Sequence, residues 1–152
     1  LSKFIIDLCI KNKAGKLVIG RNEGWKQNIN IGKKNNQAFC LIPIYLLLEK
    51  IKYKALIAGI EVVFTEESYT SKSSFFDNDP LPKYGDEKVE FSGERKSRGL
   101  YISKNGFAIN ADVNGSLNIG RKVIPEFYES KIGDRSLAAR PSVVNPLKNT
   151  TV

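Results

Sequence analysis

Two short apolar runs, each preceded by a helical pattern, constrain the fold of this chain more than any other feature. The first run, LVIG at residues 17–20, follows apolar residues that recur along one helical face of residues 2–12. The second, IEVVFT at residues 60–65, follows a helix predicted over residues 43–58, with Gly59 as its stop. This helix–strand–helix–strand order favours parallel pairing of the two strands in an α/β sheet.

The composition excludes several classes of chemistry. The chain has no histidine, which rules out Ser-His-Asp and Cys-His catalysis and zinc sites with histidine ligands. Cys9 and Cys40 are the only cysteines, both in apolar settings, so we expect core thiols in a cytoplasmic protein rather than a disulfide scaffold. No apolar stretch approaches the roughly 18 residues that a membrane span needs, so we expect no membrane partner.

The positive charge is concentrated in the first part of the chain. The net charge is +8, and residues 1–60 hold eleven Lys and Arg against three Asp and Glu, whereas residues 61–152 hold thirteen of each. Such an excess favours an anionic partner, most often nucleic acid. A solvated basic face without a partner is the alternative.

Three acids are candidates for catalysis. Glu66 and Glu67 follow the second predicted strand, and Asp112 lies at the start of a predicted helix. Ligands gather at the carboxyl ends of parallel strands, and clustered carboxylates are the oxygen ligands that Mg²⁺ prefers. Strand alternation places the two glutamates on opposite faces, so at most one should face a metal ion. The alternative is that Asp112 is a plain N-cap and the glutamates are a solvated strand end.

Several segments together resemble one family. ESYTSK and NADVNGSLNI resemble the C-terminal half of the TnpB (OrfB) family, transposon-encoded RNA-guided nucleases related to compact type V CRISPR effectors. LVIGRNEGWKQ, NIGKKNNQAF and IPIYLLLEKIKYKALIAGIEV are similar to the same family, so the resemblance covers residues 2–123. It implies a partial RNase H-like (RuvC) α/β fold with an inserted target-nucleic-acid-binding subdomain. It also implies DNA and a guide RNA as partners, and Mg²⁺ in the full-length enzyme.

The family's catalytic residues carry over only in part. Its last Asp falls on Asp112, whereas Gly20 occupies the place of its usual Glu. Glu67 is our first choice for a replacement glutamate and metal ligand, and Glu66 is the second. The family's first Asp lies on a strand upstream of the segments present here. We therefore expect no nuclease activity from these residues alone, and we expect the missing N-terminal part of the same protein to be a partner.

The resemblance also implies a degenerate zinc ribbon. The family's four zinc-binding cysteines fall on Ser74, Asp77, Ile102 and Asn105, which cannot replace four thiolates, so we expect no zinc. The subdomain should instead be held by a hairpin that turns at residues 104–106 and by apolar side chains. Those we expect in its core are Phe75, Phe76, Leu100 and Tyr101.

Candidate nucleic-acid contacts lie in two groups. The first is a polar loop whose aromatic ring could stack on a base and whose Lys and Asn side chains could meet phosphates and sugars: Trp25, Lys26, Lys33, Lys34, Asn35 and Asn36. A solvated loop with Trp25 packed against the sheet is the alternative. The second group comprises basic residues that could contact the backbone: Arg95, Lys96, Arg98, Arg121 and Lys122.

These observations predict four regions. They are the C-terminal part of a RuvC-like domain (1–68), the inserted subdomain (69–111), the last RuvC-like helix (112–124) and a poorly ordered tail (125–152). The predicted function is that of a C-terminal fragment of a TnpB-like transposase. It would bind DNA and RNA and would contribute Glu and Asp ligands to Mg²⁺-dependent DNA cleavage in the full-length protein. A non-catalytic nucleic-acid-binding module and a decayed transposase relic are the alternatives.

Overall fold

The computed structural model describes residues 1–21, 43–86 and 89–138. The candidate loop contacts from Trp25 to Asn36, and Cys40, lie outside the described residues. The chain divides into two compact units, Leu1–Phe64 and Thr65–Val152. Within the described ranges, no helix is long and apolar enough to cross a membrane.

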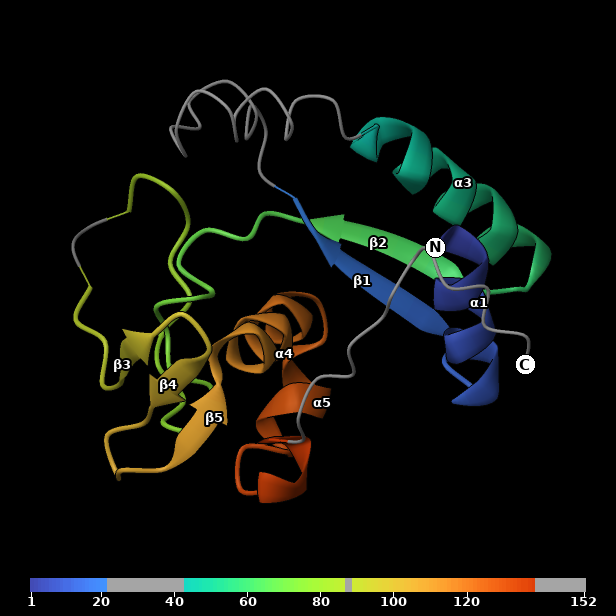
Figure 1. Ribbon diagram of the computed structural model, residues 1–152. Helices are drawn as coiled ribbons and strands as arrows, with labels where there is room; N and C mark the ends of the chain where they lie inside the picture. Colours follow the sequence, from blue (N-terminus) through green and yellow to red (C-terminus); the bar gives the residue numbers. More distant parts are fainter. Residues whose placement is uncertain (22–42, 87–88, 139–152) are drawn as a thin grey trace. The chain divides into compact units, whose positions relative to one another are not determined.

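The first unit has the predicted alternation of helices and strands. Its elements in chain order are α1 (Ser2–Lys11), β1 (Lys16–Gly20), α3 (Ile44–Ile57) and β2 (Glu61–Thr65). The two strands pair, and Figure 1 shows them running in the same direction. The backbone N–H of Glu61 donates to the carbonyl of Gly15 at 3.0 Å, so both strands begin at the same end of the sheet. The predicted parallel pairing is confirmed.

An aliphatic core holds the first unit together. Ile6 of α1, Ile51 and Ala55 of α3, and Ile60 are buried, and Leu17 of β1 packs against them. Burying each large aliphatic side chain contributes about 1.5–3 kcal/mol to stability. The core therefore joins the two helices to the sheet chiefly through apolar contact.

Two further details of the first unit match the sequence. Cys9 packs against the aliphatic core, as expected for a core thiol. Gly59 has φ +69°, a left-handed conformation that side chains disfavour, and it ends the turn after α3.

The second unit contains an antiparallel sheet and two α-helices. Its elements are β3 (Glu94–Ser97), β4 (Leu100–Ile102), β5 (Ala108–Asn110), α4 (Ala111–Val123), α5 (Pro125–Glu129) and a 3₁₀ turn, η1 (Arg135–Ala138). The strand order is β3-β4-β5. In the β4–β5 hairpin Tyr101 is opposite Ile109, and Gly106 has φ +78° at the turn. The predicted hairpin is confirmed, whereas the polar strand β3 was not expected.

The core of the second unit is aromatic and small. Phe75 and Tyr101 are fully buried, as expected, and Phe76 packs edge-on against Phe107 with ring centroids 5.0 Å apart. The expectation for Leu100 is wrong, because it neighbours Tyr101 in β4, points to the opposite face and is 38% exposed.

The expectation of a poorly ordered tail is wrong for residues 125–138. Pro125 occupies the first turn of α5, where its missing N–H costs no hydrogen bond. The ring of Tyr128 packs edge-on against buried Phe75, with centroids 6.4 Å apart. An aromatic contact to the core therefore orders α5.

Candidate carboxylate site and nucleic-acid interface

The segment after β2 carries the two adjacent glutamates, and Lys122 of α4 holds one of them. Lys122 Nζ lies 2.5 Å from Glu66 Oε1 and donates to the carbonyls of Ser68 (2.9 Å) and Pro82 (3.4 Å). Burial raises the pKa of Glu66, but hydrogen bonds from Lys122 and Ser68 outweigh it and lower this pKa below its ordinary value. Glu66 is thus an ionised anchor for this segment.

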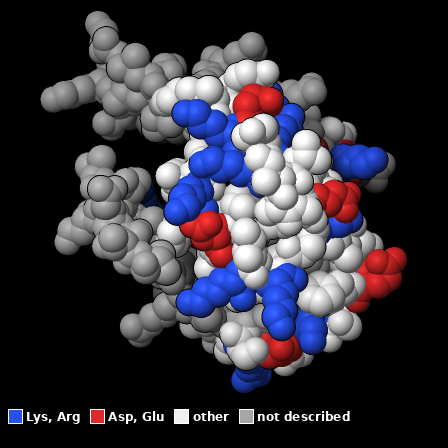
Figure 2. All heavy atoms as spheres, turned by 90° about the vertical axis from the view of Figure 1, so that its right-hand side faces the viewer, with Lys and Arg blue, Asp and Glu red and all other residues white. Residues whose placement is uncertain are grey.

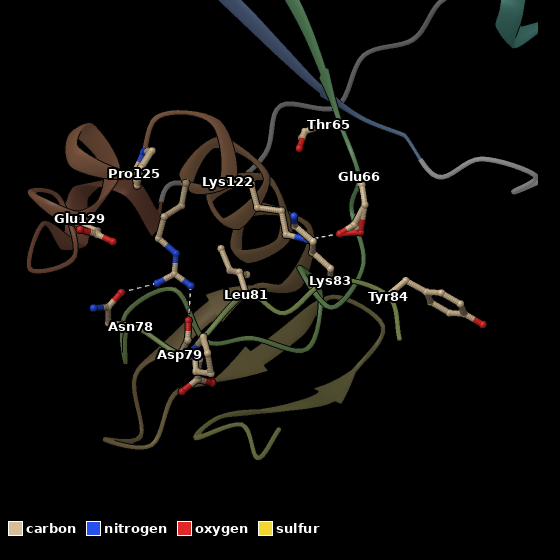
Figure 3. A pocket seen from close by; sticks show the side chains of 12 residues that line it. Thr65, Glu66, Asn78, Asp79, Leu81, Lys83, Tyr84, Lys122, Pro125 and Glu129 are labelled. Atoms are coloured by element: carbon tan, nitrogen blue, oxygen red, sulfur yellow. Dashed lines mark hydrogen bonds and ion pairs between the residues drawn. The ribbon is translucent and has the colours of Figure 1, made fainter. Parts of the chain in front are cut away.

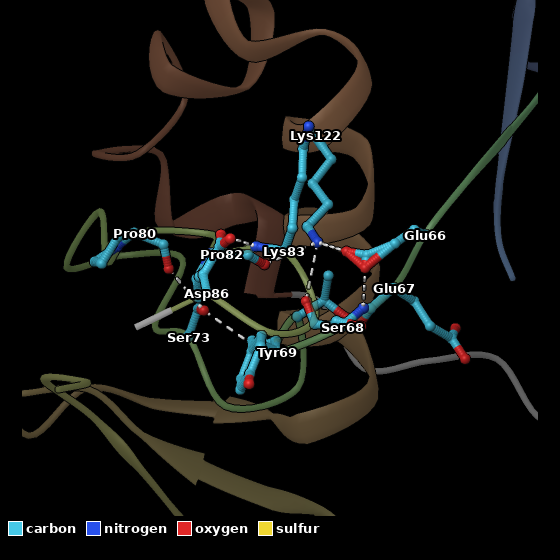
Figure 4. Close-up of polar contacts among 11 residues, drawn as sticks. Glu66, Glu67, Ser68, Tyr69, Ser73, Pro80, Pro82, Lys83, Asp86 and Lys122 are labelled. Carbon is cyan, nitrogen blue, oxygen red and sulfur yellow. Dashed lines mark hydrogen bonds and ion pairs between the residues drawn. The ribbon is translucent and has the colours of Figure 1, made fainter. Parts of the chain in front are cut away.

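Glu67 points elsewhere. Figure 4 shows its side chain directed away from Lys122 and from Glu66. The two carboxylates therefore point in different directions, and Lys122 contacts that of Glu66. The strand β2 ends at Thr65, so the strand alternation expected for the two glutamates does not extend to them.

Asp112 lies in the first turn of α4 and is not its N-cap. The side chain of Asn110 caps the helix, because its Oδ1 accepts the N–H groups of Asp112 (2.9 Å) and Val113 (3.2 Å). The Asp112 side chain is 80% exposed and lies 3.8 Å from the guanidinium of Arg95. In the described part of the chain, no three His, Cys, Asp or Glu residues form a group that could hold a metal ion.

A carboxylate joins two segments of the expected zinc ribbon. Asp77 Oδ2 accepts hydrogen bonds from Ser74 Oγ at 2.5 Å and from the backbone N–H of Lys104 at 2.8 Å. Ser74 and Asp77 belong to the loop after β2, and Lys104 to the β4–β5 turn. Asp77 therefore bridges the two chain segments to which the family resemblance assigns the cysteine pairs.

Two asparagines of α4 fasten the same loop to the helix. Asn114 Oδ1 accepts the N–H of Phe75 at 3.0 Å, and its amide donates to the carbonyl of Ser73 at 2.8 Å. Asn118 donates to the carbonyls of Thr70 (3.0 Å) and Ser73 (2.7 Å). Both asparagine side chains are fully buried, so this loop is held by hydrogen bonds in a site without water access.

The burial of Arg121 and Lys122 is at odds with the expectation that they contact a nucleic-acid backbone. Arg121 is 4% exposed and donates to Asn78 Oδ1 at 2.6 Å and to the carbonyl of Asp79. Burial lowers the pKa of Arg121. The Lys122 side chain is 10% exposed and has three acceptors. Both cations serve internal contacts.

Basic side chains that are exposed lie on and beside β3. Arg95, Lys96 and Arg98 are all exposed, and β3 is an edge strand. Arg95 donates to the carbonyls of Ser97 (3.2 Å) and Arg98, so its side chain lies along the β3–β4 turn. Lys96 pairs with Glu94. These three residues, which we call the β3 basic cluster, remain accessible to a partner.

The first unit has exposed basic residues of its own. On the face shown in Figure 2, Lys and Arg side chains predominate over Asp and Glu. The exposed lysines of its helices and of the turn after α1 are Lys3, Lys11, Lys13, Lys50 and Lys52. Lys3 and Lys52 each have an acidic neighbour on their own helix, Asp7 and Glu49.

Comparison with known proteins gives one family match. The family described as Cas12f1-like, TNB domain, matches residues 45–119. This range includes β2, the polar loop after it and all of the antiparallel sheet. No protein of curated function matches the chain.

Solved structures also match. One is described as "Cryo-EM structure of the Cas12f1-sgRNA-target DNA complex", with 26% sequence identity and a TM-score of 0.51. The match covers 78% of this chain and 31% of that one, so this chain spans about a third of the relative's length. Both matches support a relationship between this chain and the TnpB/Cas12f-like family.

Proposed function

We propose that this chain binds nucleic acid and is the target-nucleic-acid-binding region of a TnpB-like transposase. The observation that carries the proposal is the exposed β3 basic cluster within the range matched by the Cas12f1-like TNB family. The matched structure is that of a Cas12f1 protein in complex with an sgRNA and target DNA. DNA and a guide RNA are accordingly the proposed partners of the present chain.

The exposure of the β3 basic cluster suits phosphate contact. Arg95, Lys96 and Arg98 are exposed on an edge strand and the turn beside it, so a partner's phosphates can reach their charged groups. Each cation that neutralises a phosphate releases condensed counterions, which makes binding fall steeply with salt. Arg121 and Lys122, with their internal partners, are left out of this interface.

Binding as a function of salt tests the proposal. A single-stranded DNA and a DNA duplex are titrated with the chain, and the R95A/K96A/R98A variant is compared. We expect uniformly weaker binding and a smaller salt slope, by roughly one for each phosphate that the variant no longer neutralises. The control is K3A/K11A/K13A, which removes the same charge from the first unit. Equal losses of affinity in both variants would contradict a specific role for β3.

We also propose Glu67 and Asp112 as Mg²⁺ ligands for DNA cleavage in a longer protein. Carboxylate oxygens suit Mg²⁺, and the family resemblance makes Glu67 the first choice and Glu66 the second. The described residues contain no group of three ligands, and Asp112 lies in the first turn of α4, whereas Lys122, which holds the neighbouring Glu66, lies in its last turn. The proposed site would therefore need further ligands and a rearrangement that brings the two carboxylates together. When bound, Mg²⁺ would stabilise charge that develops during phosphodiester cleavage.

Metal binding by the chain itself tests these ligands without relying on cleavage. Mn²⁺ is added in place of Mg²⁺, and the broadening of backbone NMR signals is followed. We expect the strongest broadening near Glu67 and Asp112, and its loss in Glu67→Gln and Asp112→Asn. Loss in Glu66→Gln, with Glu67→Gln unchanged, would reverse the assignment.

A structural zinc does not fit the proposed ribbon. Ser74, Asp77, Ile102 and Asn105 offer no thiolate, and Asp77 already accepts hydrogen bonds from Ser74 and Lys104. We propose that this carboxylate links the two segments in place of a metal. Unfolding of the second unit should then be unchanged by a strong zinc chelator.

A non-catalytic binding module is a second candidate. Asp112 lies beside Arg95, which offers the carboxylate a role other than metal binding. One experiment distinguishes the two candidates. If a longer protein that contains this chain binds DNA in a salt-dependent way but does not cut it in the presence of Mg²⁺, the binding module is favoured. A chain that fails to fold would favour a decayed relic.

A further inference from the structure

A cavity opens within the second unit, away from the β3 basic cluster. It has a volume of about 690 Å³ and lies between the loop from Asn78 to Tyr84 and the end of α4 with the start of α5. Figure 3 shows the side chains around it. This volume is within the range typical of sites for small organic ligands, about 300–1,000 Å³.

The wall of this cavity is held in place by the buried cations of α4. Arg121 ties the helix to Asn78 and Asp79, and Lys122 ties it to Glu66. Figure 3 draws these contacts as dashed lines, with those to Asn78 and Asp79 apart from the one between Lys122 and Glu66. These contacts join α4 to the chain segments that line the cavity.

The residues that line the cavity include equal numbers of cationic and anionic side chains. The lining contains three cationic residues (Lys83, Arg121 and Lys122) and three anionic ones (Glu66, Asp79 and Glu129). Two of the cations have internal acceptors, so the interior presents no excess positive charge to a phosphate. This lining is unlike the β3 basic cluster and favours an occupant without net charge.

The remaining surface suits a flat, polar-edged group. Pro80, Leu81 and Pro125 provide apolar surface, and Glu129 provides a carboxylate that can accept hydrogen bonds. Tyr84 stands at the rim with 87% of its surface exposed, and Figure 3 shows its ring directed outward. An exposed aromatic ring next to such a cavity is a platform on which a neighbouring base can stack.

We propose that this cavity takes one unpaired nucleobase of a single-stranded segment, while Tyr84 stacks on the adjacent base. The inference rests on the proposed nucleic-acid binding and adds a base-contacting site to it. The β3 basic cluster would then contact the phosphates of the strand, and the cavity would contact an uncharged base.

The test compares two strands of the same length: a single-stranded DNA and its counterpart with abasic sugars throughout. We expect the unchanged chain to bind the normal strand about tenfold more tightly, within the range for base–aromatic stacking. In Tyr84→Ala and in Glu129→Gln this preference should fall severalfold, with binding of the abasic strand unchanged. Tyr53→Ala removes a tyrosine of similar exposure, 66%, from α3 and should keep the full preference.

Other outcomes overturn the inference in distinguishable ways. Full preference in both cavity variants, with binding still weakened in R95A/K96A/R98A, would overturn the base site and leave the proposed function standing. No binding of either strand would overturn both. Adenosine monophosphate that binds as tightly as the strand would mean a site for free nucleotides instead.

Discussion

Each of the two units is stabilised by a different kind of core. The core of the first consists of aliphatic side chains, with Ile6, Ile51 and Ile60 at its centre. The second buries polar groups, among them Asn114, Asn118 and Arg121, beside a few aromatic rings. Apolar cores tolerate substitutions that conserve volume, whereas each buried hydrogen bond needs both of its partners. The second unit should therefore be the more sensitive to changes of side-chain chemistry at constant size.

The largest expected effect follows from removing the amide of Asn114. Asn114→Leu keeps the approximate volume but leaves the N–H of Phe75 and the carbonyl of Ser73 without this partner. We expect a loss of about 3 kcal/mol from the second unit, measured by urea unfolding and local hydrogen exchange. The matched change in the first unit, Ile51→Leu, should cost less than about 1.5 kcal/mol. Equal losses of unfolding free energy in the two variants would contradict the distinction between the units.

A second prediction concerns the close packing of α4 and α5. A Cβ atom added at Gly120 would overlap the ring of Tyr128, so Gly120→Ala should displace α5 and destabilise the second unit by about 2 kcal/mol. Gly115→Ala is the control on the same helix, because nothing lies within 4 Å of its added Cβ. It should stabilise the unit by about 0.5–1 kcal/mol through helix propensity. Stabilisation by both changes would contradict the α4–α5 contact.

A smaller effect is expected from the hydroxyl of Tyr101. It donates to the carbonyl of Lys72 at 2.7 Å, and Tyr101→Phe should cost about 1 kcal/mol. Burial and the charges of Asp79 and Asp77 raise the pKa of Tyr101 to about 12. Because the unfolded state releases this proton near pH 10, the second unit should lose stability as pH rises from there towards 12. Tyr101→Phe should remove this part of the pH dependence, and Tyr53→Phe should leave it unchanged.

The smallest effect is expected at Glu66. Its pKa is lowered, so its contribution to stability is present above the ordinary value of 4.5 and is lost as pH falls through the folded-state pKa. Glu66→Gln should cost less than about 1 kcal/mol at pH 7, because the carboxylate is 39% exposed. The difference from the unchanged chain should disappear in acid. A difference that persists at pH 2 would mean that the ion pair with Lys122 is not its source.

The same contrast explains what the sequence could predict. The sequence predicted α3 and β2 from the apolar periodicity of residues 43–58 and from the apolar run that follows. This was possible because the residues of an aliphatic core recur at the spacing of the helix or strand that carries them. Asn114, Asn118 and Arg121 were missed as core residues, although their spacing of four and three residues along α4 places them on one helical face. A polar face at helical spacing usually meets solvent, so only the fold could distinguish it.

The candidate site was predictable to a similar extent. The alternation argument did not apply to Glu66 and Glu67, because β2 ends at Thr65. No local pattern revealed that Lys122, 56 residues further on, would engage Glu66. Strand β3 was missed because its residues are all exposed and carry no apolar alternation. Its basic residues were nevertheless identified as candidate contacts from charge alone.

The most direct test of the account is hydrogen exchange of the chain with and without a single-stranded DNA. The account predicts slower exchange on binding at residues 94–98, which include the β3 basic cluster, and at residues 78–84 along the cavity. The helices of the first unit should change less. Slower exchange confined to α1 and α3, with residues 94–98 unchanged, would contradict the assignment of the nucleic-acid interface to the second unit.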